Sequence, residues 1–141
     1  MFKKVSIITA QIIHDNLANL EKGVAKLIPQ NNSKATKFPR RRPKDGFLDF
    51  NKDAISLYNL IRGVTHPFPG AFTFVNGKKL FVWWAKPIEG NGNIGEIVSI
   101  NPLCVGTKNG LLELKKLQWE YGQEMVASHF SDELPIGTKF N

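Results

Sequence analysis

The sequence is poor in cysteine and lacks any long apolar run. Its 141 residues include a single cysteine, Cys104. One cysteine excludes an internal disulfide framework and is typical of the reducing cytoplasm, where we expect this chain to reside. No apolar stretch approaches the ~20 residues that cross a bilayer, so no membrane-spanning segment or membrane partner is predicted. No Cys/His cluster of metal-ligand spacing is present either, and we predict no metal site.

The beginning of the sequence lacks the cleavage site of a secretory signal. Residues 1–13, MFKKVSIITAQII, carry positive charge followed by apolar residues. However, His14 and Asp15 follow at once, with no small-residue cleavage motif, so the signal-peptide interpretation is rejected.

Instead, the periodicity of residues 5–22 predicts an amphipathic helix that ends at Gly23. Its apolar side chains fall on one broad arc at about 100° per residue: Val5, Ile8, Ile12, Ile13, Leu17 and Leu20. So wide an arc requires a surface to pack on, and we expect self-association of the chain through this helix.

Positive charge is concentrated in the first half of the chain. Lys and Arg outnumber Asp and Glu by 12 to 5 over residues 1–70 and are matched 7 to 7 over residues 71–141. Most of the excess is one run that lacks carboxylates: Lys34, Lys37, Arg40, Arg41, Arg42 and Lys44. Clustered arginine forks and lysine charges bind phosphate well, although a charge run of this kind can also be a solvated linker.

The pattern changes from helix to strand near Gly70. Asn51 is expected to cap a second helix over about residues 52–62, whose buried face is Ile55, Tyr58, Leu60 and Ile61 and which Gly63 ends. Asn76-Gly77 then separates two strand-like arms and predicts a type I′ hairpin. Further strands are expected at residues 95–100, 102–106, 110–117 and 136–140, with a short helix at residues 123–130.

These elements predict an α+β fold: a detached N-terminal helix, a basic connector, one further helix, and a small OB-like antiparallel β-barrel. Within the barrel, adjacent Trp83 and Trp84 must point to opposite faces of a strand, so at most one reaches the core. Packing explains these tryptophans better than a platform for stacking nucleic-acid bases.

The ordered series of motifs resembles the C-terminal portion of the 10-formyltetrahydrofolate-dependent formyltransferases, whose members act on methionyl-tRNA or on nucleotide sugars. The motifs that carry the resemblance are SKAT at 33–36, Arg41, Asp45-Gly46, Asp49, Asn59, Ile61-Arg62, Pro69-Gly70-Ala71, GEIVSINPL at 95–103, GLLELKKLQ at 110–118 and IGTKFN at 136–141. This resemblance implies three parts. Residues 1–30 would be the tail of a missing Rossmann-like catalytic domain, 31–69 the basic connector and helix, and 70–141 the barrel.

The same resemblance implies that the catalytic groups lie outside this chain. The family uses an Asn-x-His pair, a distant Asp and a folate pocket in its N-terminal domain. None of His14, His66 and His129 has an asparagine two residues before it. The chain alone is therefore predicted to be inactive. Its partners would be the catalytic domain, which would bind 10-formyltetrahydrofolate, and the substrate.

Residues Arg41 and Arg42 are the strongest candidates for contact with substrate phosphate, followed by Lys34 and Arg62. Because the barrel half is neutral, we expect the substrate to be a nucleotide-linked amino sugar rather than tRNA. The Arg41-Arg42 pair before Pro43-Lys44-Asp45-Gly46 also resembles the sugar enzymes, and this resemblance implies the 4-amino-4-deoxyarabinose type on UDP. Two alternatives stay open. They are the tRNA-binding domain of methionyl-tRNA formyltransferase and a free-standing OB-like nucleic-acid-binding module.

Overall fold

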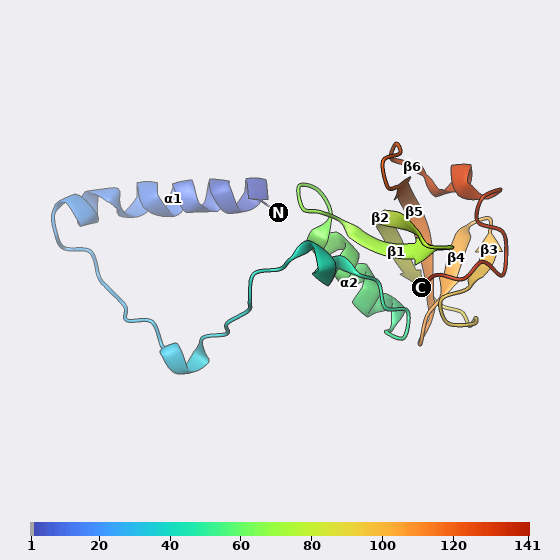
Figure 1. The fold of residues 1–141 in the computed structure, drawn as a ribbon. Helices are drawn as coiled ribbons and strands as arrows, with labels where there is room; N and C mark the ends of the chain where they lie inside the picture. Colours follow the sequence, from blue (N-terminus) through green and yellow to red (C-terminus); the bar gives the residue numbers. More distant parts are fainter. Residues whose placement is uncertain (1) are drawn as a thin grey trace. The chain divides into compact units, whose positions relative to one another are not determined.

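The protein is described by a computed structural model that covers residues 2–141 (Figure 1). It divides into two compact units, Met1–Pro39 and Arg40–Asn141. The first contains α1 (Phe2–Glu21) and a 3-10 turn at Asn32–Lys34. The second contains a 3-10 turn at Pro43–Gly46, α2 (Ala54–Val64), and six strands. The predicted α+β class is confirmed.

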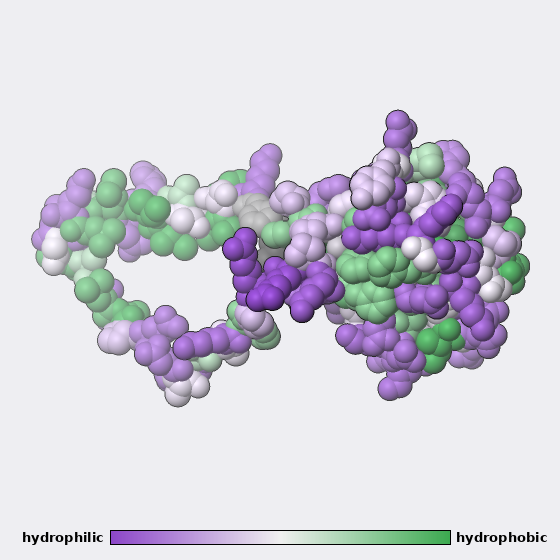
Figure 2. Space-filling model, viewed as in Figure 1, coloured by the Kyte–Doolittle hydropathy of each residue, from purple (hydrophilic) through white to green (hydrophobic). Residues whose placement is uncertain are grey.

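Helix α1 matches the predicted N-terminal helix but begins earlier, at Phe2. It ends where expected, since Gly23 adopts a left-handed φ of 67° and its N–H donates to the carbonyl of Leu20. No side chain between Lys3 and Pro39 is buried. Figure 2 shows the apolar side chains of α1 exposed along the helix.

Antiparallel strands build the second unit, in the spatial order β1-β2-β5-β4-β3. Their bounds are β1 Ala71–Val75, β2 Lys78–Ile88, β3 Ile97–Ile100, β4 Leu103–Gly106 and β5 Leu111–Trp119, and β6 (Met125–Val126) pairs with β5. The predicted β1–β2 hairpin is confirmed, because Asn76 and Gly77 both have positive φ, 50° and 76°.

The C-terminal segment connects the two edges of this sheet. At one edge, the N–H of Ile97 donates to the carbonyl of Thr138, and that of Phe140 donates to Gly95. At the other edge, Phe74 and Asn141 exchange two backbone hydrogen bonds of 3.1 and 2.9 Å. A closing segment therefore exists as predicted, although it makes an isolated bridge at Lys139 rather than a regular strand. The result is a small barrel-like domain.

Helix α2 covers the sheet, but three details of its prediction were wrong. The N-cap residue is Asp53, because the amide of Asn51 is hydrogen-bonded to the carboxylate of Asp49 instead. Ile55 is exposed, and the buried positions are Ala54, Leu57, Ile61 and Val64. Gly63 lies inside the helix, which continues to Val64. The register of the buried face is thus set by packing against β2, β5 and β1.

The predicted helix at residues 123–130 was also only partly right. Its first half is β6, and only Ala127–Phe130 turns, as a 3-10 helix. Phe130 is fully buried and contacts Trp119. Pairing with β5 therefore prevailed over local helix preference in this segment.

A β-bulge interrupts β2 at the tryptophan pair. The register against β5 shifts on both sides of Trp84. As a result Trp83 is 8% exposed, whereas Trp84 is 39% exposed and pairs across the sheet with Lys116. The expectation of opposite faces is not confirmed, because the two tryptophans line the same groove across this bulge. Cys104 is a buried thiol, and this burial raises its pKa.

Candidate functional site

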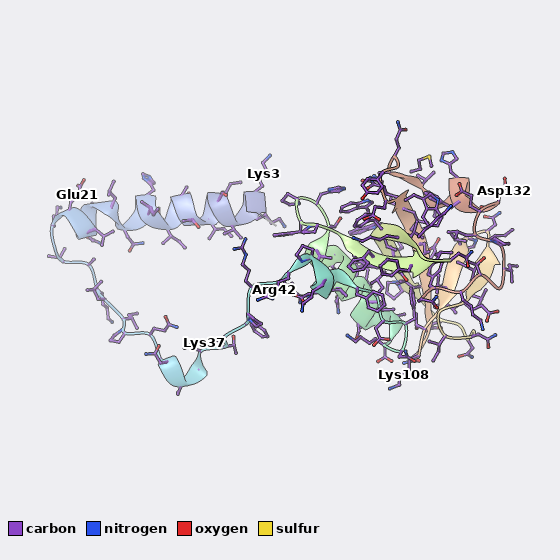
Figure 3. The ribbon with its side chains drawn as sticks, in the orientation of Figure 1. Lys3, Glu21, Lys37, Arg42, Lys108 and Asp132 are labelled. Carbon is purple, nitrogen blue, oxygen red and sulfur yellow. The ribbon has the colours of Figure 1, made fainter. Side chains whose placement is uncertain are left out.

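A short turn holds the arginine run at the start of the second unit. The backbone N–H of Arg42 donates to a carboxylate oxygen of Asp45 at 2.6 Å, and the N–H of Asp45 donates to the carbonyl of Arg42 at 2.9 Å. Pro43 starts the turn with its fixed φ. The turn therefore has a defined shape, and it begins directly after the three arginines. Figure 3 shows Arg42 at this position.

This turn lies against the loop after α2 through two glycines. A Cβ on Gly46 would lie 2.5 Å from the carbonyl oxygen of Gly70. Gly70 itself has a φ of 89°, and a Cβ there would lie 2.8 Å from the ring of Trp83. Only glycine permits this approach of two backbones. The Asp45-Gly46 and Pro69-Gly70-Ala71 motifs, which are distant in sequence, therefore meet here.

The contact encloses a pocket of about 470 Å³. Its charged side is Arg40, Arg41 and Arg42, and its opposite wall includes Val64, Phe68 and Pro69. Within residues 2–141, no carboxylate forms an ion pair with any of these arginines. Guanidinium groups next to an apolar wall bind an anion more strongly than they would in open water. The structure thus brings Arg41 and Arg42 together, and it adds Arg40, which the run of three arginines could have indicated.

Arg41 also borders a second cavity of about 490 Å³ on the other side of the turn. Lys52 and Asn59 line this cavity, together with Asp45. Asn59 is one of the motif residues, and its exposed position on α2 is consistent with a contact to ligand rather than with a role in the core. Arg41 is therefore the arginine with access to both cavities.

The two other predicted site residues lie elsewhere. The guanidinium of Arg62 lies 5.5 Å from the ring centroid of Tyr58, in the last turn of α2, where a cation also favours the helix dipole. Lys34 is exposed in the first unit, in the turn after Asn31, whose side chain accepts a hydrogen bond from the N–H of Ser33. Neither residue lines the arginine pocket.

Three of the seven lysines of the barrel half have acidic partners. Lys79 lies 3.7 Å from Glu120, Lys116 lies 2.8 Å from Glu124, and Lys115 is paired with Glu113. The barrel half has no net charge because it holds as many acidic side chains as lysines. At the arginine pocket, by contrast, three neighbouring cations have no acidic partner among the described residues.

One cluster of aromatic and charged residues, centred on His66, was not predicted from the sequence. The ring of His66 stacks on Trp83 with 3.8 Å between centroids, and its Nε2 lies 2.9 Å from Glu124. Glu124 also accepts from Lys116, and this bond is the main reason why its pKa lies below the ordinary value. No local pattern connects His66 with Glu124, 58 residues away, so only the fold reveals the contact.

The three histidines of the described residues have different environments. His14 and His129 are exposed, and His66 is hydrogen-bonded to Glu124. No group of three His, Cys, Asp or Glu side chains in residues 2–141 could hold a metal ion. Among the helices described, none has the length and apolarity needed to cross a membrane.

Comparison with protein families places the chain in a class. The family model described as formyl transferase, C-terminal domain, matches residues 41–134. The match covers well over half of the chain, and its first residue is Arg41. The chain therefore belongs to the formyl transferase C-terminal domain family.

Relatives narrow the comparison further. Methionyl-tRNA formyltransferases from several strains of Streptococcus pneumoniae are 38% identical over 146 residues, which covers 99% of this chain and 47% of theirs. The chain thus spans about half the length of these curated relatives. Since they are named for methionyl-tRNA, the expected preference for a nucleotide sugar is not supported.

Solved structures agree with the fold. HypX from Aquifex aeolicus, in complex with tetrahydrofolic acid, superposes with a TM-score of 0.65 and 20% identity over 89% of this chain and 23% of its own. A variant of the same protein gives 0.65 and 21%. At this identity the likeness shows the fold alone.

Proposed function

We propose that this chain is the C-terminal part of a methionyl-tRNA formyltransferase and helps to hold the tRNA while a separate catalytic domain transfers the formyl group. The observation that carries this proposal is the 38% identity to methionyl-tRNA formyltransferases across 99% of the chain. In this proposal residues 1–30 are the tail of the catalytic domain, 31–69 the connector and 70–141 the barrel.

Electrostatics support a role for the arginine pocket in phosphate binding. The sequence argument against tRNA was the neutrality of the barrel, which holds equal numbers of lysines and acidic residues. The positive charge of the arginine pocket is separate from that balance, since none of its arginines has an acidic partner in the part of the chain described. Backbone phosphates of a tRNA would therefore be bound first at Arg40–Arg42.

Catalysis in this proposal belongs to the other domain. That domain would bind 10-formyltetrahydrofolate, which supplies the formyl group, and would hold the groups that accept the amine's proton and stabilise the oxyanion. This chain would contribute orientation, which lowers the barrier by fixing the reacting ends. We expect the chain alone to transfer no formyl group.

A chimera tests the proposal. The matching half of the Streptococcus pneumoniae enzyme is replaced by this chain and assayed with 10-formyltetrahydrofolate. We expect formylation of methionyl initiator tRNA and none of UDP-linked amino sugars. Formylation of the sugar alone would overturn the tRNA assignment while leaving the family intact. Formylation by the unfused chain would show that the catalytic groups had been misplaced.

The pocket is tested in the same chimera by Arg41→Gln and Arg42→Gln. Each lost charge-assisted contact is worth about 1.5–3 kcal/mol, so the KM for tRNA should rise about tenfold or more. The slope of log affinity against log salt should also become shallower by about 0.7–0.9 per contact. Lys108→Gln, which removes an exposed charge far from Arg42 (Figure 3), is the matched control. Equal effects of all three variants would rule out a specific arginine site.

A further inference from the structure

A groove on the barrel is not used by the function proposed above. It has a volume of about 610 Å³ and lies between the loop at Thr65–His66 and strands β2, β5 and β6. We name it the Trp84 groove, after the residue at its base. The ionisable residues that line it are His66, Lys86, Lys115, Lys116 and Glu124.

Stacked rings hold one side of the Trp84 groove rigid. Phe81, Trp83 and His66 are nearly parallel, with interplanar angles of 16° and 13° between successive rings. The indole N–H of Trp83 donates to Gln118 at 2.7 Å, and Glu124 holds His66. Trp83 therefore cannot leave the stack without loss of these bonds.

Trp84 has a different environment from Trp83. It is 39% exposed, although it is one of the largest apolar side chains of the barrel. Its recorded ring contact is an edge contact with Tyr58, at 6.2 Å and 77°. Stacking between Phe81 and His66 therefore accounts for the burial of Trp83, whereas part of the Trp84 ring stays open to a planar ligand in the groove.

Positive charge surrounds this open ring. Lys86 is exposed, two residues beyond Trp84 on the same strand, and forms no ion pair with a carboxylate of residues 2–141. Lys115 and Lys116 lie on the neighbouring strand, and their side chains are 38% and 54% exposed despite their acidic partners. The one carboxylate lining the groove, that of Glu124, is already bound to Lys116 and His66.

We propose that the Trp84 groove binds one nucleotide of an unpaired RNA segment, with the base stacked on Trp84 and its phosphate held by Lys86. Every base has a flat face that stacks on indole, and a phosphate complements lysines at the edge of the ring. A paired base would be sequestered in a duplex, so the base must be unpaired. This inference rests on the proposed function, which makes tRNA the RNA that the chain would encounter.

The test uses the whole chain and a fluorescein-labelled single-stranded RNA of about ten nucleotides, within the range covered by small barrels. Fluorescence anisotropy gives the affinity. Trp84→Ala should weaken binding about 5-fold to 100-fold. Tyr121→Asn is the control, because it removes a fully exposed aromatic ring outside the groove, and asparagine tolerates the positive φ at that position. Unchanged binding by Trp84→Ala would overturn the proposal.

A second variant tests the phosphate contact independently of stacking. Lys86→Gln should reduce the slope of log affinity against log salt by about 0.7, whereas Lys108→Gln should reduce it much less. Competition then identifies the ligand. Duplex RNA of the same sequence, free UMP and an acidic aromatic peptide should each compete more weakly than the single strand. Equal competition by any of them would overturn the assignment to an unpaired RNA segment.

Failure of this inference can be separated from failure of the proposed function. If RNA binding does not depend on Trp84 but the chimera formylates methionyl-tRNA, the function stands and the inference fails. If RNA binding depends on Trp84 and the chimera formylates only an amino sugar, the inference stands and the proposed function fails.

Discussion

Large apolar side chains are exposed in the first unit of the chain, whereas many are buried in the second. In α1, Val5, Ile8, Ile12, Ile13, Leu17 and Leu20 are 47–57% exposed. In Arg40–Asn141, leucines and isoleucines such as Leu57, Ile61 and Leu117 are completely buried. An apolar arc is therefore enough to predict a helix, but burial also requires a surface, which the first unit does not contain.

Truncation of one leucine in each unit tests this contrast most strongly. Leu57→Ala should lower the free energy of unfolding by about 2–5 kcal/mol, because it removes buried methyl groups and leaves a cavity between α2 and the sheet. Leu17→Ala should change it by no more than about 0.5 kcal/mol, since its side chain is already half exposed. Urea unfolding monitored by tryptophan fluorescence measures both. Comparable losses would mean that α1 has a stable partner.

Substitution of two glycines tests whether the Pro43–Gly46 turn, which follows the three arginines, depends on close contact with Gly70. Gly46→Ala should cost about 1–3 kcal/mol, because the added Cβ would clash with the carbonyl of Gly70 and force the turn away. Gly63→Ala should stabilise the protein by up to about 1 kcal/mol, since a Cβ there meets nothing within 4 Å and alanine favours the helix. Thermal unfolding compares the two. Tolerance of Gly46→Ala would show that the approach to Gly70 is not required.

The exposed arc of α1 leads to a third prediction, self-association. Burial of such a side chain is worth about 1.5–3 kcal/mol when complete, so Ile12→Glu should weaken association by about 1–2 kcal/mol. Gln11→Glu adds the same charge on the polar side of the helix and should have little effect. Sedimentation over a range of protein concentrations gives the association constant of each variant. A wild-type chain that stays monomeric throughout would contradict the prediction.

The features that the sequence predicted well are local ones. Asn76-Gly77 determines a hairpin through two positive φ angles, and Gly23 ends α1 in the same way, so no distant contact was needed. By contrast, the cap and buried face of α2 were misassigned at Asn51 and Ile55. There the carboxylate of Asp49 binds Asn51 and prevents it from capping the helix, and packing against the sheet determines which side chains are buried.

The site was predictable only in part, for the same reason. The arginine run identified Arg41 and Arg42 as phosphate ligands, and the structure places both in one pocket, although their contact with a substrate stays a prediction. The opposite wall of that pocket depends on the approach of Gly46 to Gly70, which connects segments distant in sequence. Charge counting favoured a nucleotide sugar because the barrel half is neutral, whereas the curated relatives of the chain are named for methionyl-tRNA, and a net count does not show where the cations of a domain gather.

The smallest expected effect concerns Glu124, which links β5 to the loop of His66. Hydrogen bonds, first from Lys116 and then from His66, lower the pKa of this carboxyl below its ordinary value of 4.5. A lowered folded-state pKa stabilises the protein above the unfolded pKa, and this contribution is lost as the pH falls through the folded value. Glu124→Gln should therefore cost less than about 1 kcal/mol at pH 7, as a largely solvated pair would. The difference from wild type should shrink in acid and disappear once the pH lies below the lowered folded-state pKa, where the carboxyl of the wild-type protein is also neutral. Urea unfolding at pH 7 and below that pKa measures this difference, and a difference that persists in acid would show that the carboxyl acts through packing rather than charge.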